Sequence, residues 1–306
     1  MCAIIIKYDE VFGNSDKIWD IDENGELRGY NGKGGVIAIP DGVKVVAKGA
    51  FRWNNAVTSV VFPASVKKIG DMAFFSCRAL RQVRLTNNLS EIGESAFEAC
   101  SELKKVFLAP EGAPEEGGDR EQNEVKEDKK AEKTAAPSVE KPSGVIGKCA
   151  FAFCDELSSA ELPSGITRIG PNVFEMCRLL KRVTLPPFLE SVGEMAFLSC
   201  EALEKCELPD TLKKIGALAF CYTAFEKVNL PDTVVSVGAE AFRRIRRLIS
   251  VSLPAALEAL PSGFLAGCPA LKKIIYRGTA EMWERVTKDK NWIDTNNDIA
   301  IEFRPQ

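Results

Sequence analysis

Hydrophobic residues recur along most of the chain in a pattern of 22 or 23 residues. The dipeptide Ala-Phe, or a close variant, marks the period, and the steps between successive phenylalanines are 23, 23, 54, 23, 23, 23, 22 and 22. The step of 54 exceeds the period by 31, so the chain carries nine units and one insertion of 31 residues. The phenylalanines are Phe51, Phe74, Phe97, Phe151, Phe174, Phe197, Phe220, Phe242 and Phe264.

Each unit follows the pattern C-x-x-L-x-x-V-x-L-P-x-x-L-x-x-I-G-x-x-A-F, as in Cys177–Phe197. The segment L-x-x-V-x-L, for example Leu80–Leu85, is typical of a β-strand, and the proline after it ends the strand. The glycine is expected to turn the chain by taking a positive φ, and the Ala-Phe side chains are expected to point inward. The pattern therefore predicts one strand and one tight turn per unit.

A unit of 23 residues is too short to bury its own apolar side chains, whereas stacked units bury them against one another. We therefore expect a β-rich repeat solenoid, a curved array of about nine units, over residues 36–276. Each end of such an array needs an atypical segment that covers the core.

The repeated unit resembles the BspA-type leucine-rich repeats, a class first associated with bacterial surface proteins. The resemblance covers about residues 36–276 apart from the insertion, and it implies a leucine-rich-repeat fold. It also implies a role in binding other proteins, since some relatives act as surface adhesins. The departures from the pattern are Ala47 in place of the first glycine, Leu260-Pro261 in place of Ile-Gly, and the shorter units that end at Phe242 and Phe264.

The two ends of the chain suggest caps. Residues 1–35 are expected to form a β cap, because strand-like stretches flank Asp22–Gly25, in which Asn-Gly suits a type I′ hairpin turn. Residues 277–306 are expected to form a small α/β cap, in which Thr279 caps a short helix over residues 280–286. The apolar residues of a final strand are Ile299, Ile301 and Phe303.

The insertion, over residues 109–143, differs in composition from the repeats. It holds ten acidic and six basic residues and no Ile, Leu, Met, Phe, Trp or Tyr. Such a segment cannot bury enough apolar surface to offset its ordering entropy, so we expect a disordered acidic insertion. As a flexible coil it would span on the order of 30 Å. Its role stays open between a tolerated surface loop, a partner-binding segment and an autoinhibitory segment.

Composition narrows the possible chemistry. Forty basic and forty-three acidic residues give a net charge of −3, which argues against nucleic acid or an anionic membrane as a partner. The chain has no histidine, which excludes Ser-His and Cys-His pairs, a histidine base and histidine metal ligands. No phosphate-binding glycine motif is present in the sequence. We therefore expect neither catalysis nor a cofactor.

The longest apolar stretches, such as Val57–Phe62, are far shorter than the roughly 20 residues that cross a bilayer, so no membrane span is expected. Met1–Lys7 lacks the basic region of a secretory signal peptide. The sequence as written favours a cytoplasmic location. A cell-surface or secreted location is the alternative, if a signal has been removed or another export route is used.

Six of the ten cysteines occupy equivalent positions, three or four residues after the repeat phenylalanine. Stacked units would place them in a column at steps of about 5 Å. Buried core thiols are the favoured interpretation, with disulfides between neighbours or a metal site as weaker alternatives. Free thiols would also favour a reducing compartment. The six are Cys77, Cys100, Cys154, Cys177, Cys200 and Cys268.

The candidate binding positions are the third and fifth places of L-x-x-V-x-L, because a solenoid presents them as one continuous face. This face has mixed polarity with an excess of cations. We expect Phe107 to be exposed beside the insertion and to anchor a partner. The candidate contact residues are Arg84, Phe107, Arg182, Lys205 and Lys227.

One dense basic cluster lies at residues 243–247. It is interpreted first as a solvated turn, and second as a site for an acidic partner or for the acidic insertion. Nucleic acid is disfavoured, since four arginines without a broader basic stripe or interleaved aromatic residues form a weak footprint. The arginines are Arg243, Arg244, Arg246 and Arg247.

Together these observations favour a non-catalytic protein–protein interaction module whose strand-lined face binds a protein ligand of unknown identity. A bacterial cell-surface or secreted adhesin is the first alternative. An enzyme that uses cysteine or carboxylate groups is a weaker one, because the usual catalytic partners of these groups are missing.

Overall fold

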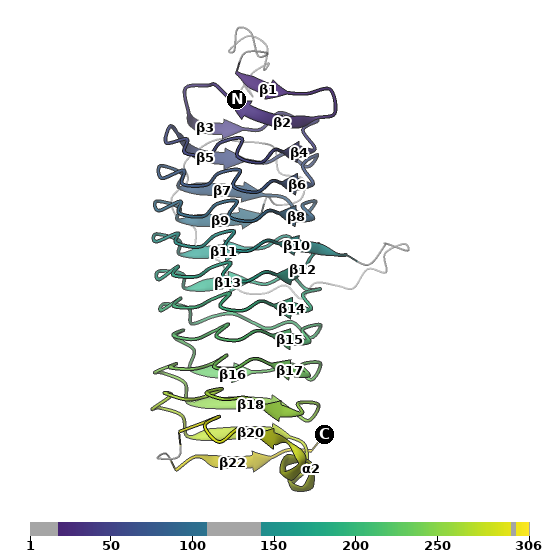
Figure 1. The fold of residues 1–306 in the computed structure, drawn as a ribbon, viewed down its shortest axis with the longest axis vertical. Helices are drawn as coiled ribbons and strands as arrows, with labels where there is room; N and C mark the ends of the chain where they lie inside the picture. The colour runs from purple at the N-terminus through teal and green to yellow at the C-terminus, as the bar shows by residue number, and fades with distance from the viewer. Residues whose placement is uncertain (1–17, 109–141, 295–297, 306) are drawn as a thin grey trace, which may run out of the picture.

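The computed structural model describes residues 18–108, 142–294 and 298–305, and the structural statements below refer to these residues. The chain winds into a stack of flat coils that runs from β1 at the N-terminal end to β22 at the C-terminal end (Figure 1). The strands of successive coils pair side by side and form two walls around a continuous apolar core. This arrangement is the β-rich repeat solenoid that the sequence predicts.

The first wall is a ten-stranded sheet that is parallel except for the antiparallel hairpin β1–β2. Most of its strands are short and end at the aliphatic residue before the repeat glycine. In sheet order they are β1 (Trp19–Ile21), β2 (Glu26–Tyr30), β4 (Val45–Val46), β6 (Lys68–Ile69), β8 (Glu91–Ile92), β10 (Gly144–Ile146), β12 (Ile166–Ile169), β14 (Ser191–Val192), β15 (Lys214–Ile215) and β17 (Ser236–Val237).

The second wall, called here the strand face, is built from the L-x-x-V-x-L segments and divides into two parallel sheets. The six-stranded sheet contains β3 (Gly35–Ala38), β5 (Val57–Val61), β7 (Gln82–Leu85), β9 (Lys105–Leu108), β11 (Ser159–Glu161) and β13 (Arg182–Thr184). The four-stranded sheet contains β16 (Lys227–Asn229), β18 (Ser250–Pro254), β20 (Lys273–Arg277) and β22 (Ala300–Phe303). A single bridge from Arg182 to Lys205 extends the six-stranded sheet by one coil, and among the described residues no pairing links Lys205 to β16.

The C-terminal cap contains α2 (Ala280–Arg285) and a two-stranded sheet of β19 (Ala259–Leu260) and β21 (Thr287–Lys288). Thr279 caps α2 as predicted, since its hydroxyl accepts a hydrogen bond from the Met282 N–H at 3.2 Å. Trp283 is buried and packs against Tyr276, with ring centroids 5.1 Å apart. Within the described ranges, no helix has the length and apolar character needed to span a bilayer.

The predicted N-terminal hairpin is present, but the predicted type I′ turn is wrong. A type I′ turn needs positive φ at both central residues, whereas Gly25 has a φ of 80° and Asn24 is not in that region. The Asp22 carboxylate holds the turn instead by accepting hydrogen bonds from the N–H groups of Glu26 and Asn24, both at 2.9 Å. The hydrogen bond from Glu26 is the main cause that lowers the pKa of Asp22. Residues 1–17 of the predicted cap lie outside the described residues.

The repeat phenylalanines form a column of parallel rings through the core, called here the phenylalanine column. From Phe51 to Phe242, consecutive rings stack with centroids 4.5–5.3 Å apart and interplanar angles of 2–15°. All of these side chains are at most 2% exposed. The inward orientation expected for Ala-Phe is therefore confirmed.

The ninth phenylalanine leaves this column. Phe264 packs edge-on to Phe242 at 88°, and its carbonyl accepts the Phe242 N–H. One coil earlier, the equivalent acceptor is the carbonyl of Ala241, which receives the Phe220 N–H. Phe264 therefore occupies the position of the repeat alanine and not that of the repeat phenylalanine. Leu265 thus takes the ring position. The prediction that the last unit is one residue short is wrong, because the step from Phe242 to Leu265 is 23 residues.

The glycines of the Ile-Gly pairs do not turn the chain, so the prediction of positive φ is wrong for them. They are needed because the backbone of the preceding coil passes too close for a side chain. A Cβ added at Gly216 would lie 2.4 Å from the Glu194 nitrogen. The turn is made by the residues two before and two after the repeat aromatic position, such as Met72 and Ser76. All fifteen described non-glycine residues with positive φ stand at these two positions.

The predicted disorder of the insertion falls on residues 109–141, which lie outside the described residues, and it stays a prediction. The strands on either side of the insertion nevertheless pair directly, β9 with β11 through Lys105 and Ser159, and β8 with β10 through Ile92 and Ile146. The register of both walls is therefore unbroken. The cap boundaries at residues 35 and 276 also stay predictions.

Candidate functional site

A row of three cations, called here the cation row, lies on the strand face where its two sheets meet. Arg182 begins β13 and is bridged to Lys205, and Lys227 begins β16 in the following coil. All three are exposed, and in the described part of the chain none lies within ion-pair distance of a carboxylate. Paired strands are about 4.8 Å apart, so the like charges of Arg182 and Lys205 repel each other. An anionic group bound at this row would relieve the repulsion.

Two of the acidic residues beside the cation row are paired with Arg247, whereas a third, the exposed Glu207, follows Lys205 by two residues on the strand face. The Arg247 guanidinium contacts the carboxylate of Glu204 at 2.7 Å and that of Glu226 at 2.5 Å. These glutamates directly precede Lys205 and Lys227 in the chain. The hydrogen bond to Glu226 is the largest of the contributions that raise the pKa of Arg247. The cations of the row are therefore left without these nearby counter-charges.

The other arginines of the 243–247 cluster are also largely engaged. Arg243 forms an ion pair with Glu240 at 2.6 Å, and Arg244 donates a hydrogen bond to the Tyr222 hydroxyl. Arg246 is exposed. The interpretation as a solvated turn fits this geometry. A site for an acidic partner at the cluster stays a prediction, and at Arg243 and Arg247 it would compete with ion pairs that already exist.

Arg84 and Phe107 lie opposite each other on β7 and β9, apart from the cation row. The prediction that Phe107 is exposed is wrong, because its side chain is half-buried. Arg84 is half-buried too, and its Nε has no hydrogen-bond partner among the described atoms. Phe107 therefore offers less surface to a partner than its place beside the insertion suggests.

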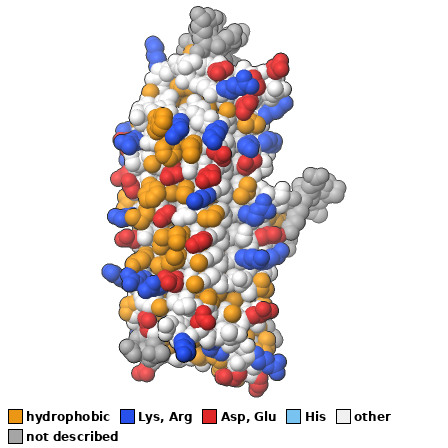
Figure 2. All heavy atoms as spheres, in the orientation of Figure 1, with side chains coloured by type: hydrophobic (Ala, Val, Ile, Leu, Met, Phe, Trp, Pro, Cys, Tyr) orange, Lys and Arg blue, Asp and Glu red, His pale blue; other side chains and the backbone are white. Residues whose placement is uncertain are grey.

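An apolar surface that the sequence analysis did not identify runs along the loops that precede the strands of the strand face. We call it the turn edge, and its exposed side chains include Trp53 (59% exposed), Phe153 (40%) and Leu179 (47%). The Arg52 guanidinium lies 3.9 Å above the Trp53 ring. Figure 2 shows hydrophobic side chains gathered over this side of the solenoid. Exposed apolar patches of this kind mark interaction surfaces.

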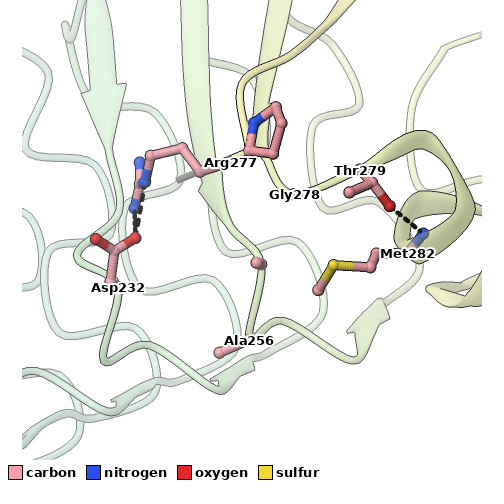
Figure 3. A pocket seen from close by; sticks show the side chains of 8 residues that line it. Asp232, Ala256, Arg277, Gly278, Thr279 and Met282 are labelled. Atoms are coloured by element: carbon pink, nitrogen blue, oxygen red, sulfur yellow. Dashed lines mark hydrogen bonds and ion pairs between the residues drawn. The ribbon is translucent and has the colours of Figure 1, made fainter.

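A hollow of about 340 Å³ lies at the C-terminal end, between the last coils and α2 (Figure 3). Arg277 lines it and takes the place that Pro254 holds one coil earlier. Its guanidinium bonds Asp232 at 2.8 Å, the Ser252 hydroxyl at 2.5 Å and the Leu230 carbonyl at 2.5 Å. These bonds tie three coils together, so we assign Arg277 a role in holding the cap. In the sequence, the arginine at the position of the repeat proline is the feature that could have indicated this role.

The cysteine column is confirmed as a row of buried core thiols. Each of the six Sγ atoms donates a hydrogen bond to the carbonyl of the repeat phenylalanine one coil earlier, at 3.0–3.3 Å. All described cysteines are free, so the disulfide alternative is wrong for them. Burial raises the pKa of Cys100, Cys154 and Cys200 well above the usual range, and that of Cys268 to about 11.

These thiols are expected to be unreactive in the folded protein. At pH 8 we expect DTNB to modify none of the six column thiols in the folded protein, whereas all ten cysteines should react in the denatured protein. The sign of the pH effect follows from the raised pKa values. Above about pH 9 the unfolded thiols ionise while the buried ones stay protonated, so stability falls as the pH rises. Rapid modification of a column thiol in the folded protein at neutral pH would instead favour a cysteine-dependent enzyme.

Most coils contribute a leucine-rich strand segment that pairs in parallel with the next coil, and most coils add one ring to the phenylalanine column. These features are those of a leucine-rich-repeat solenoid. The family model described as a BspA type leucine rich repeat region matches residues 31–113 and 144–272 in six copies. This is more than half of the chain, so the protein belongs to the BspA-type leucine-rich repeat family, as the repeat pattern predicts. No significant match was found among curated proteins.

Several solved structures are similar to the solenoid. A leucine-rich repeat protein from Bacteroides ovatus is 22% identical, with 94% of this chain and 76% of that chain covered and a TM-score of 0.52. A leucine rich cell surface protein from Faecalibacterium prausnitzii is 20% identical, with coverage of 89% and 96% and a TM-score of 0.43. At this level of identity the first structure supports the shared fold and nothing further.

Proposed function

We propose that the protein is a non-catalytic interaction module that binds an acidic segment of a protein ligand on the strand face. Membership of a leucine-rich repeat family supports protein binding in general, because stacked repeats present an extended surface. The cation row carries the finer proposal. Its three side chains are exposed and lack a described carboxylate partner, although two glutamates stand beside them. A carboxylate-rich ligand would supply the missing counter-charge.

The turn edge supports the same proposal, because it adjoins the cation row. Leu179, which is 47% exposed, precedes Arg182 by three residues in one coil. A ligand that crosses both surfaces would combine an apolar contact with charge pairing. Apolar anchors contribute most of the affinity at such interfaces, whereas charge pairing contributes orientation and a faster association.

Reversing the charge of the cation row is expected to weaken binding of an acidic peptide about tenfold or more. The triple variant Arg182→Glu, Lys205→Glu, Lys227→Glu removes three attractive contacts, each worth about 0.2–1 kcal/mol at an exposed site, and replaces them with repulsive ones. Fluorescence anisotropy with a fluorescein-labelled poly-glutamate peptide at an ionic strength of about 0.1 M measures the change. A poly-glutamine peptide of the same length is the ligand control.

The matched protein control is the triple variant Lys44→Glu, Lys67→Glu, Lys148→Glu, which makes the same change in net charge away from the strand face. All three lysines are exposed. We expect this variant to bind poly-glutamate within about twofold of the unmodified protein, since charges beyond a Debye length of about 10 Å are largely screened. Equal losses in the two variants would show that net charge, and not the cation row, attracts the peptide.

A further inference from the structure

The strand β22 is the last strand of the strand face, and no other described strand pairs with its outer edge (Figure 1). In its register with β20, Ile301 and Phe303 stand opposite Ile274 and Tyr276, which point into the core. Those two residues are 1% exposed, whereas Ile301 is 40% and Phe303 39% exposed. The difference arises because no described coil follows β22. An apolar patch therefore lies beside a strand edge.

The free edge of β22 presents backbone groups of defined direction. The N–H groups of Ala300 and Arg304 donate to carbonyls on the β20 side, at Lys272 and Tyr276. Successive residues of a strand direct their backbone groups to opposite sides, so those of residues 299, 301 and 303 face away from β20. Residues 300–303 contain neither proline nor lysine, which commonly protect exposed edges. This edge can accept another strand.

We propose that β22 pairs with β22 of a second copy of this chain, antiparallel about a two-fold axis at Ile301. In this register Ile301 faces its own counterpart and Ile299 faces Phe303, so the exposed apolar residues meet one another. The three residues whose backbone groups face the edge all become hydrogen-bonded pairs. The strand faces of the two copies then join into one sheet.

Charge complementarity selects the second copy and this register. On the outward side of the paired strands, Asp298 of one copy opposes Arg304 of the other, and Glu302 opposes Ala300. Within each copy Arg304 also contacts the Glu302 carboxylate at 3.2 Å, so pairing would place its guanidinium between two carboxylates. A two-fold axis at Glu302 would place two glutamates directly opposite each other, which is unfavourable. A shift that breaks the two-fold symmetry separates Asp298 from Arg304. The sequence around β22 is thus self-complementary about one residue.

Cysteine cross-linking tests the register. Directly paired residues on antiparallel strands have Cα atoms about 5.5 Å apart, within disulfide range. Ile301→Cys is therefore expected to form a disulfide-linked dimer under mild oxidation, seen on a non-reducing gel. Glu302→Cys is the matched control, because residue 302 faces residue 300 and is not expected to cross-link. Cross-linking of Glu302→Cys alone, or of neither variant, would overturn the proposal.

Mass measurement tests the dimer itself. Light scattering after size exclusion is expected to give twice the monomer mass of 33.5 kDa at about 100 µM, a concentration at which a micromolar dimer predominates. Ile301→Lys is expected to raise the dissociation constant at least tenfold, whereas Ile21→Lys at the opposite end leaves it unchanged. Circular dichroism verifies that both variants are folded.

A charge exchange completes the test. Asp298→Arg and Arg304→Asp are each expected to weaken the dimer severalfold. The double variant is expected to recover part of this loss, because Arg304→Asp also removes the ion pair between Arg304 and Glu302. A monomer at every concentration, or open-ended growth into longer assemblies, would contradict pairing about a two-fold axis. Failure of the double variant to recover would contradict the Asp298–Arg304 contact and with it the register.

Discussion

Replacing Phe174 with alanine is expected to lower the free energy of unfolding by about 3–5 kcal/mol. Phe174 is fully buried, and its ring lies 5.3 Å from that of Phe151 and 5.3 Å from that of Phe197. The substitution removes one ring from the middle of the phenylalanine column and loses two stacking contacts. Strand pairing holds the neighbouring coils at a fixed spacing, so they cannot close the cavity. Urea unfolding followed by far-UV circular dichroism measures the loss.

Phe188→Ala is the control, since Phe188 is 50% exposed and its removal should cost less than about 1 kcal/mol. Phe174→Leu should be intermediate, because Leu265 already fills the ring position in the last coil. Comparable losses from Phe174→Ala and Phe188→Ala would show that the phenylalanine column is not a main source of stability.

The second large effect is expected from a single added methyl group. Gly216→Ala should lower the free energy of unfolding by about 3 kcal/mol or more, at the upper end of the range for overpacking. Its Cβ would lie 2.4 Å from the Glu194 nitrogen and 2.6 Å from the Gly193 carbonyl carbon. Both atoms belong to the backbone of the preceding coil and cannot rotate away. The coils would have to separate, which also strains the pairing of β14 with β15.

Gly165→Ala is the matched control for this substitution. A Cβ at Gly165 would meet its nearest atom, the Leu89 carbonyl oxygen, at 3.5 Å, and its φ is not positive. We expect the change to be neutral or stabilising by a few tenths of a kcal/mol, because alanine restricts the unfolded chain. If both variants unfolded at the same urea concentration, close approach between coils would not be the reason for glycine at position 216.

The fold could be predicted from the sequence because the repeat imposes the same constraints on every coil. The strand segment and the inward aromatic residue recur at the same period many times, so no single ambiguous residue decides the architecture. The cysteine column was predictable for the same reason. Thr279 and the alternation at Ile299, Ile301 and Phe303 predicted the cap, because capping and strand patterns depend on local sequence.

The failed predictions concern contacts between coils. A glycine in a sequence does not show whether its positive φ or its lack of a side chain is used, and at Gly216 only the second applies. Phe264 and Leu265 are adjacent apolar residues, and the match to phenylalanine in the other units wrongly assigned Phe264 to the ring position. The pairing of Arg247 with Glu204 and Glu226, which are 43 and 21 residues away, follows from stacking and not from local sequence.

The direct pairing of β9 with β11 and of β8 with β10 shows where this chain tolerates changes of length. A segment placed between Leu108 and Pro142 alters neither wall, because both ends of the segment lie at a turn between them. The length and sequence of that segment can therefore change in evolution without a change in the core. Related proteins can diverge at this turn while the solenoid and its binding surface are retained.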